Sequence, residues 1–171
     1  MNQVNGYLYD PHTHTAETSK CGHLPAAEVV DRYVAKGFTG LVVTDHLHPE
    51  YLSRVDTQHN WDAVMDHYLS GYHASKARGD QVGLDVILGA ELRFPENDND
   101  YLVYGIDEQW LRSNPYVCCM SAREFFAKFY DQVLIIHAHP YRDGNTAVSY
   151  THLRAHETRS DLVCRLLLEK K

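Results

Sequence analysis

Two histidines, His12 and His14, stand one residue apart near the start of the chain and point to metal chemistry. Alternate side chains of an extended segment face the same way, so both imidazoles can reach one metal ion. Histidine is also abundant, at 12 of 171 residues, and several histidines lie beside carboxylates. Because such pairs also occur in ordinary surface loops, this pair alone leaves metal binding and a surface role open.

Further polar residues follow apolar runs of the sequence. Asp45 and His46 form one such group, Glu91 is the second and His139 is the third. Each has an ordinary explanation, because a strand-end glutamate can form an ion pair and a histidine can be hydrogen-bonded in a core. Their joint occurrence at the ends of predicted strands favours a metal centre instead.

The elements that must position these residues alternate along the chain. Strands are predicted over residues 6–10, 40–44, 85–91, 101–105 and 133–136. Helices are predicted over 25–36, 60–72 and 121–129, with a polar loop over 47–60. This order predicts an α/β fold with parallel strands, whose site lies at their carboxyl ends. The readable strands are too few for a closed eight-stranded barrel but fit a truncated one.

Composition excludes several classes of protein. Apolar residues make up 44% of the chain and charged residues 23%, which is typical of a folded protein. No apolar run approaches the roughly 18 residues of a membrane span. The net charge of −7 argues against a dedicated nucleic-acid surface. The four cysteines form no CxxC motif, and together with a start that lacks a secretory signal they predict a cytoplasmic protein.

The segment 148–171 differs from the rest of the chain. It holds 5 basic and 3 acidic residues, against 11 and 20 in residues 1–147. Its run VSYTHLRAHET resembles a translated sequencing adapter, and DLVCRLLLEKK resembles the primer sequence that follows. An amphipathic helix around Leu162 and Leu166 is the alternative. We therefore expect 1–147 to be the N-terminal part of a barrel domain, 148–171 to be a non-native, adapter-derived tail, and the natural protein to continue beyond residue 147.

Four short motifs occur in a fixed order: residues 10–15 (DPHTHT), 44–46 (TDH), 89–91 (GAE) and 138–140 (AHP). Together they resemble the successive motifs of the PHP (polymerase and histidinol phosphatase) family. The resemblance implies a distorted (β/α)7 TIM-like barrel, truncated in this chain, that holds two or three divalent metal ions. It also implies hydrolysis of phosphate esters, because the family includes histidinol phosphatases, nucleotide phosphatases and polymerase exonuclease domains.

The resemblance assigns metal ligands residue by residue. His12 and His14 would bind the first ion, and Glu91 would bridge the first and second ions. His139 would bind the second ion and His46 the third.

The chain also departs from the family pattern. Asp100 occupies a position where the family often has histidine, although a carboxylate is itself a competent ligand for hard metals. His23 is a candidate for the ligand that usually follows the first motif, but its spacing from His14 is long. The family's final Asp-x-His motif has no counterpart between Pro140 and Ala147.

The expected function is that of a metal-dependent phosphoesterase similar to histidinol phosphatase, which hydrolyses a phosphate monoester or diester by metal-activated water. Zinc, manganese and iron all suit a histidine-rich site. Asp45 would orient a ligand or manage a proton, and Arg142 would clamp a phosphate or lie in a solvent-exposed loop. The partner would be a small phosphorylated substrate. A nucleotide substrate is left open, and no nucleic-acid or membrane partner is expected.

Two alternatives stay open. Amidohydrolase barrels also begin with two histidines one residue apart and bind one or two metals, although the motifs at 44–46 and 138–140 fit them less well. The other alternative is an inactive or regulatory metal-binding barrel fragment.

Overall fold

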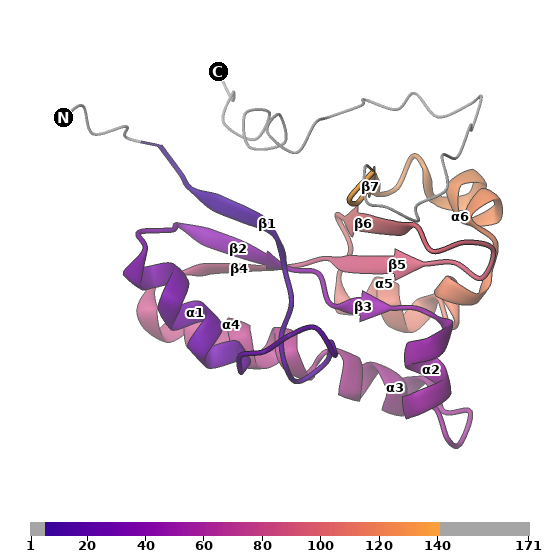
Figure 1. The fold of residues 1–171 in the computed structure, drawn as a ribbon, viewed down its shortest axis with the longest axis horizontal. Helices are drawn as coiled ribbons and strands as arrows, with labels where there is room; N and C mark the ends of the chain where they lie inside the picture. Colours follow the sequence, from indigo (N-terminus) through magenta and orange to yellow (C-terminus); the bar gives the residue numbers. More distant parts are fainter. Residues whose placement is uncertain (1–5, 141–171) are drawn as a thin grey trace.

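The computed structural model describes residues 6–140, whose strands form two sheets that lie end to end (Figure 1). The first sheet holds β1 (Tyr9–Thr13), β2 (Gly40–Val43) and β4 (Asp85–Leu88) in the order β1-β2-β4. The second holds β3 (His46–Leu47), β5 (Ala90–Arg93), β6 (Asp100–Tyr104) and β7 (Leu134–His137) in the order β3-β5-β6-β7. The strands of the described residues do not close into a barrel.

Two segments of chain run through both sheets and join them. β2 leads into β3 across Thr44 and Asp45, and β4 leads into β5 across Gly89. The passage is tight at Gly89, where an added Cβ would lie 3.0 Å from Thr44 Cγ2 and 3.1 Å from Val42 Cγ1. Glycine permits this approach because it has no side chain. The break between the sheets therefore gathers the polar ends of neighbouring strands in one place.

The prediction of parallel pairing throughout is wrong for part of the second sheet. β1, β2 and β4 are parallel, as are β3 and β5, but β6 is antiparallel to β5 and β7 is antiparallel to β6. Only residues 94–99 connect β5 to β6, and a parallel pair needs a longer crossover. The strand predicted over 85–91 is two strands, and the first strand reaches Thr13, so His12 lies within it.

Helices flank the two sheets. They are α1 (Ala26–Ala35), α2 (Pro49–Val55), α3 (Trp61–Tyr68), α4 (Ser70–Val82), α5 (Glu108–Ser113), the short 3-10 helix η1 (Val117–Cys119) and α6 (Ala122–Phe129). Figure 1 shows α1 to α4 along one side of the sheets, with α5 and α6 beside the second sheet. Within residues 6–140, no helix has the length and apolar character that crossing a membrane requires.

Local signals account for most of the helix boundaries. The Asn60 side chain accepts a backbone hydrogen bond and begins α3, and Ser121 and Glu124 form the predicted capping box of α6. The single helix predicted over 60–72 is instead two helices that meet at Leu69. The region expected to be a polar loop contains α2.

Two hydrophobic cores hold the helices against the sheets. The smaller core lies between α1, α4 and the first sheet and includes Val30, Leu41 and Val86. The larger core belongs to the second sheet and includes Phe94 and Phe125, whose ring centroids are 5.1 Å apart. Burial of one such ring contributes about 1.5–3 kcal/mol. Each sheet thus packs on its own hydrophobic core, and the polar residues between the two sheets are fixed by elements of both.

Gly71, in the first turn of α4, lies against this break. An added Cβ would overlap Thr15 Oγ1 and would lie 3.1 Å from Asp45 Oδ2. Thr15 cannot readily move away because it is fully buried and donates a hydrogen bond to Asp45. We expect Gly71→Ala to lower the free energy of unfolding by about 1–3 kcal/mol, measured by urea denaturation. Gln81→Ala, an exposed change on the same helix, should alter it by less than about 0.5 kcal/mol. Equal effects of the two changes would contradict the prediction.

Candidate metal centre

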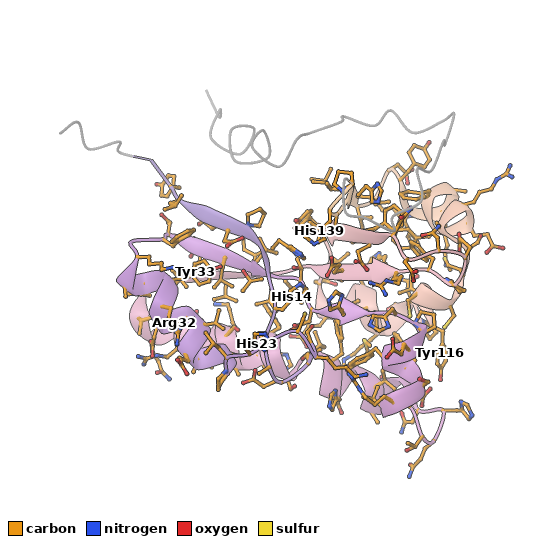
Figure 2. All side chains as sticks on the ribbon, viewed as in Figure 1. His14, His23, Arg32, Tyr33, Tyr116 and His139 are labelled. Carbon is orange, nitrogen blue, oxygen red and sulfur yellow. The ribbon has the colours of Figure 1, made fainter. Side chains whose placement is uncertain are left out.

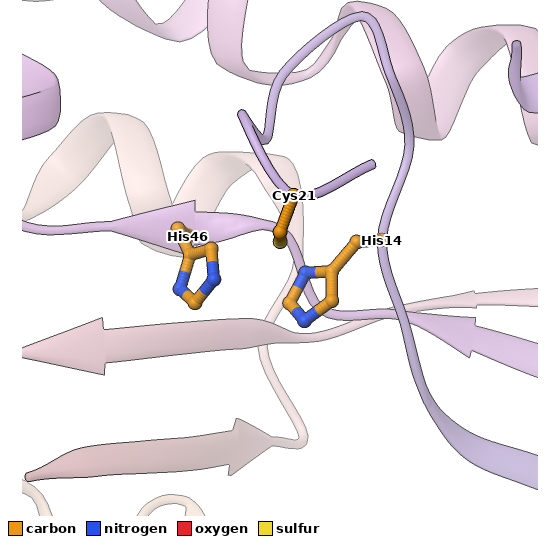
Figure 3. A group of neighbouring side chains, drawn as sticks. All are labelled: His14, Cys21 and His46. Carbon is orange, nitrogen blue, oxygen red and sulfur yellow. The ribbon is translucent and has the colours of Figure 1, made fainter. Parts of the chain in front are cut away.

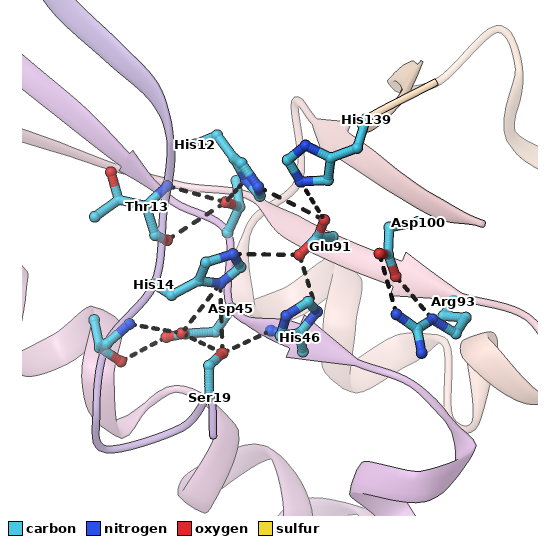
Figure 4. Close-up of polar contacts among 12 residues, drawn as sticks. His12, Thr13, His14, Ser19, Asp45, His46, Glu91, Arg93, Asp100 and His139 are labelled. Carbon is cyan, nitrogen blue, oxygen red and sulfur yellow. Dashed lines mark hydrogen bonds and ion pairs between the residues drawn. The ribbon is translucent and has the colours of Figure 1, made fainter. Parts of the chain in front are cut away.

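Four histidines surround the carboxylate of Glu91 at the break between the sheets (Figure 4). His12 Nε2 and His139 Nε2 lie 3.6 and 3.7 Å from Glu91 Oε1. His14 Nε2 and His46 Nδ1 lie 3.3 and 2.9 Å from Glu91 Oε2. Each carboxylate oxygen therefore faces two imidazoles, an arrangement in which one carboxylate can bridge two cations.

These donors come from separate strands. His12 lies on β1, with His14 just beyond its end, and His46 on β3 is in register with Glu91 on the parallel strand β5. His139 follows β7 and has a φ of +48°, in the left-handed region that residues other than glycine seldom adopt. Strain of this kind costs about 1–3 kcal/mol and often accompanies functional sites. Tertiary contacts therefore hold His139 in an unfavourable backbone conformation beside Glu91.

Glu91 is almost completely buried, with 1% of its side chain exposed. Within residues 6–140, its nearest partner is His46 Nδ1, 2.9 Å from Oε2, and the other three imidazoles lie 3.3–3.7 Å away. Burial raises the pKa of Glu91, but contact with His46 and the charges of the nearby imidazoles outweigh it, so the pKa is lowered overall. A buried carboxylate costs several kcal/mol unless cations and hydrogen bonds compensate its charge. The donor set fits divalent metal ions for this reason.

Two of the four histidines, His12 and His14, favour the neutral form that binds a metal. Burial lowers the pKa of His12, and it lowers the pKa of His14 to about 4. Burial also acts to lower the pKa of His46, but contact with Glu91 outweighs it, and that pKa is raised. His12 Nδ1 lies 2.7 Å from Thr44 Oγ1, which leaves Nε2 directed toward Glu91. A hydrogen bond to one ring nitrogen of a histidine leaves the other ring nitrogen free to bind a metal.

Asp45, predicted to orient a ligand or to manage a proton, anchors the loop that carries His14. Its carboxylate accepts hydrogen bonds from Thr15 N at 2.8 Å, Thr15 Oγ1 at 2.7 Å and Ser19 Oγ at 2.7 Å. Ser19 Oγ in turn accepts one from His46 N at 3.0 Å. Burial raises the pKa of Asp45, and these hydrogen bonds oppose that effect. These contacts tie Asp45 to the loop that follows His14, and its role in orienting a ligand or managing a proton stays a prediction.

Asp100 lies near the cluster but is held by Arg93. Arg93 Nε and Nη2 donate to its two carboxylate oxygens at 2.9 and 3.1 Å. Asp100 also forms a group with His46 and Glu91 whose ligand atoms all lie within 4.8 Å of one another. Its role as a ligand stays a prediction, and a metal there would have to compete with the guanidinium.

Two other predicted site residues are not brought to the cluster. His23 is exposed and belongs to none of the groups of metal-binding side chains among the described residues. Figure 2 shows His23 beside the start of α1, whereas His14 and His139 lie between the two sheets. Arg142 lies outside the described residues.

Cys21 was missed by the sequence interpretation. Its thiol lies close to His14 and His46 (Figure 3), and the ligand atoms of the three residues lie within 4.8 Å of one another. Burial raises the pKa of the Cys21 thiol, and Glu91, Asp45 and Asp100 raise it further. The only signal in the sequence is its place in the loop between the first histidine pair and the first helix.

Comparison with known proteins supports the fold. No protein-family profile and no curated protein sequence matches the chain. The chain is similar in structure to a two-domain protein from Bacteroides vulgatus ATCC 8482 that contains a predicted PHP-like metal-dependent phosphoesterase, with a TM-score of 0.54 and 14% identity. That match covers 82% of this chain but 36% of the other, so the chain spans little more than a third of its length.

An amidohydrolase from Chromobacterium violaceum, solved with bound sulfate and no metal, is 24% identical but has a TM-score of only 0.38. The match covers 58% of this chain and 28% of that one. Fold and site together define a class: a mixed α/β protein, similar in fold to that two-domain protein, whose clustered histidine and carboxylate side chains are compatible with divalent metal ions.

Proposed function

We propose that this chain is a metal-dependent phosphoesterase. The observation that carries the proposal is the buried Glu91 carboxylate, each of whose oxygens faces two imidazoles. A purely structural ion pair needs one cationic partner, whereas four imidazoles, each able to bind a metal ion, surround this carboxylate.

The ligand sets of the proposed centre follow from the distances. His12 and His139 would hold one ion with Glu91 Oε1, and His14 and His46 would hold a second with Glu91 Oε2. This pairing differs from the expected one, which placed His12 and His14 on the same ion. A third ion near Asp100 is part of the proposal, and zinc, manganese and iron all suit the donors. Divalent ions in such a centre neutralise phosphate oxygens and acidify water for attack on phosphorus.

A small cavity beside the cluster supports an anionic substrate. Its volume is about 160 Å³, and three of its lining residues, Lys20, Arg54 and Arg93, are cationic. Glu50 is the acidic residue of the lining and pairs with Lys20 at 3.2 Å. Guanidinium and ammonium groups recognise phosphate oxygens by charge and hydrogen bonding. We assign the phosphate of a small phosphorylated substrate to this cavity, and we propose that Arg142 also binds the phosphate.

The proposal also includes the expected fold, a truncated (β/α)7 barrel. In this proposal, β1, β2 and β4, with their helices α1 and α4, would be the beginning of a distorted (β/α)7 barrel. Residues 1–147 would form the N-terminal part of that barrel, with 148–171 outside it. A cytoplasmic location and histidinol phosphate as the substrate also stay proposals.

The test uses the full chain, its metal content and a panel of substrates. Metal is measured by mass spectrometry after dialysis, and hydrolysis is then measured on p-nitrophenyl phosphate, bis-p-nitrophenyl phosphate, histidinol phosphate, AMP and a cyclic ureide. We expect phosphate-ester hydrolysis that needs zinc, manganese or iron and stops with a chelator. Hydrolysis of the ureide alone would identify an amidohydrolase. Tight metal binding without any hydrolysis would identify a regulatory metal-binding domain.

A further inference from the structure

The loop between β1 and α1 places a sulfur atom beside two of the metal-centre histidines. The ligand atoms of His14, Cys21 and His46 lie within 4.8 Å of one another. The two imidazole rings are stacked, with centroids 4.5 Å apart and planes 16° apart, and Figure 3 shows the Cys21 thiol beside both rings. A thiol and two imidazoles that converge in this way form a familiar set of zinc donors.

The position of Cys21 is built by the backbone of the loop. Thr15 O accepts a hydrogen bond from Ser19 N at 3.0 Å, and Ser19 O accepts one from Gly22 N at 3.0 Å. Gly22 lies so close to Thr15 that a Cβ at residue 22 would overlap the Thr15 carbonyl. Because the Asp45 carboxylate also binds both Thr15 and Ser19, the turn that carries Cys21 is closed on itself and tied to β2 and β3.

We propose that Cys21 supplies a thiolate ligand to a metal ion held together with His14 and His46. This inference rests on the proposed function, since the two histidines also face Glu91. A thiolate favours zinc over harder ions such as manganese and magnesium, so Cys21 would select the metal at this position. Cys21 and His46 also line the cavity with the three cations, so an ion at this position would be open to a substrate phosphate.

Among the described residues, Cys21 forms no disulfide. Cys21, Cys118 and Cys119 are all free. Cys118 and Cys119 lie in η1, which follows α5 in the chain and is far from Cys21 in sequence. No disulfide joins Cys21 to either of them. Cys119 is exposed like Cys21, which makes it a matched control for substitution.

Cobalt(II) substitution of the full chain tests the proposal, because a thiolate ligand adds a strong near-ultraviolet charge-transfer absorption that imidazole and carboxylate ligands do not give. We expect the cobalt protein to show this absorption, Cys21→Ser to lose it while keeping visible cobalt bands, and Cys119→Ser to keep both. Zinc affinity measured by calorimetry should fall more than about tenfold in Cys21→Ser, with manganese affinity nearly unchanged.

The outcomes separate this inference from the proposed function. If cobalt binds without the charge-transfer absorption, or if the absorption persists in Cys21→Ser, the thiolate assignment is overturned while the metal centre stands. If cobalt does not bind to wild-type protein that circular dichroism shows to be folded, the proposed metal centre itself is overturned.

Discussion

Replacing Glu91 with glutamine is expected to abolish metal binding and phosphate-ester hydrolysis together. The amide keeps nearly the same shape but removes the negative charge that faces all four imidazoles. Loss of an outer partner of a metal site typically costs about 10- to 100-fold in affinity or activity, and loss of a bridging ligand should cost more. Metal content by mass spectrometry and kcat/KM on p-nitrophenyl phosphate check this result.

Glu28→Gln is the matched control for this change. Glu28 pairs with Arg32 at 2.7 Å on the exposed face of α1, away from the metal centre. Exposed pairs of this kind contribute about 0.3–0.5 kcal/mol, so metal content and activity should stay at the wild-type level. A Glu91→Gln protein that keeps its metal and its full activity would rule out the bridging role.

Removing the Asp45 carboxylate is expected to loosen the metal-binding loop and to destabilise the fold. Asp45→Ala deletes the acceptor of three hydrogen bonds from Thr15 and Ser19. Hydrogen bonds to a charged group contribute about 1.5–3 kcal/mol each, so the loss should reach about 3 kcal/mol or more. Because the loop holds His14 and Cys21, metal affinity should fall as well. Urea denaturation and metal titration measure the two effects.

Asp45→Asn distinguishes positioning from proton transfer. The amide oxygen can still accept hydrogen bonds from Thr15 N and Ser19 Oγ, and the amide nitrogen can donate to Thr15 Oγ1. We therefore expect stability, metal affinity and kcat in Asp45→Asn to lie much closer to wild type than in Asp45→Ala. Full metal binding with loss of kcat and of its pH dependence would show that Asp45 handles a proton. Asp66→Asn, at an exposed ion pair with Arg112, controls for the loss of a surface charge.

Local sequence signals predicted most of the elements and the core of the site. Apolar runs and capping residues depend on near neighbours in the chain, so the strands that precede Asp45 and Glu91 and the capping box of Ser121 could be predicted without a structure. The convergence of His12 and His46 on Glu91 also followed from sequence, because the ends of neighbouring strands meet at one edge.

Several features depended on contacts between distant segments. The passage at Gly89 divides the run over 85–91 between two sheets, and the short connection to Asp100 turns β6 antiparallel. Spacing along the chain could not show which histidines share an oxygen of Glu91, because His139 approaches from a strand far away in sequence.

Tertiary structure also decided which residue of the first loop reaches the histidines. The sequence named His23 as the candidate ligand of this loop, but the loop closes through Thr15, Ser19 and Gly22 and places Cys21 beside His14 instead. The sequence by itself thus determined the histidine and carboxylate donors and the strands that carry them. Which histidines share each oxygen of the buried Glu91 carboxylate was decided by tertiary packing. Packing brings together residues that are far apart in the chain, and local sequence periodicity carries no information about such contacts.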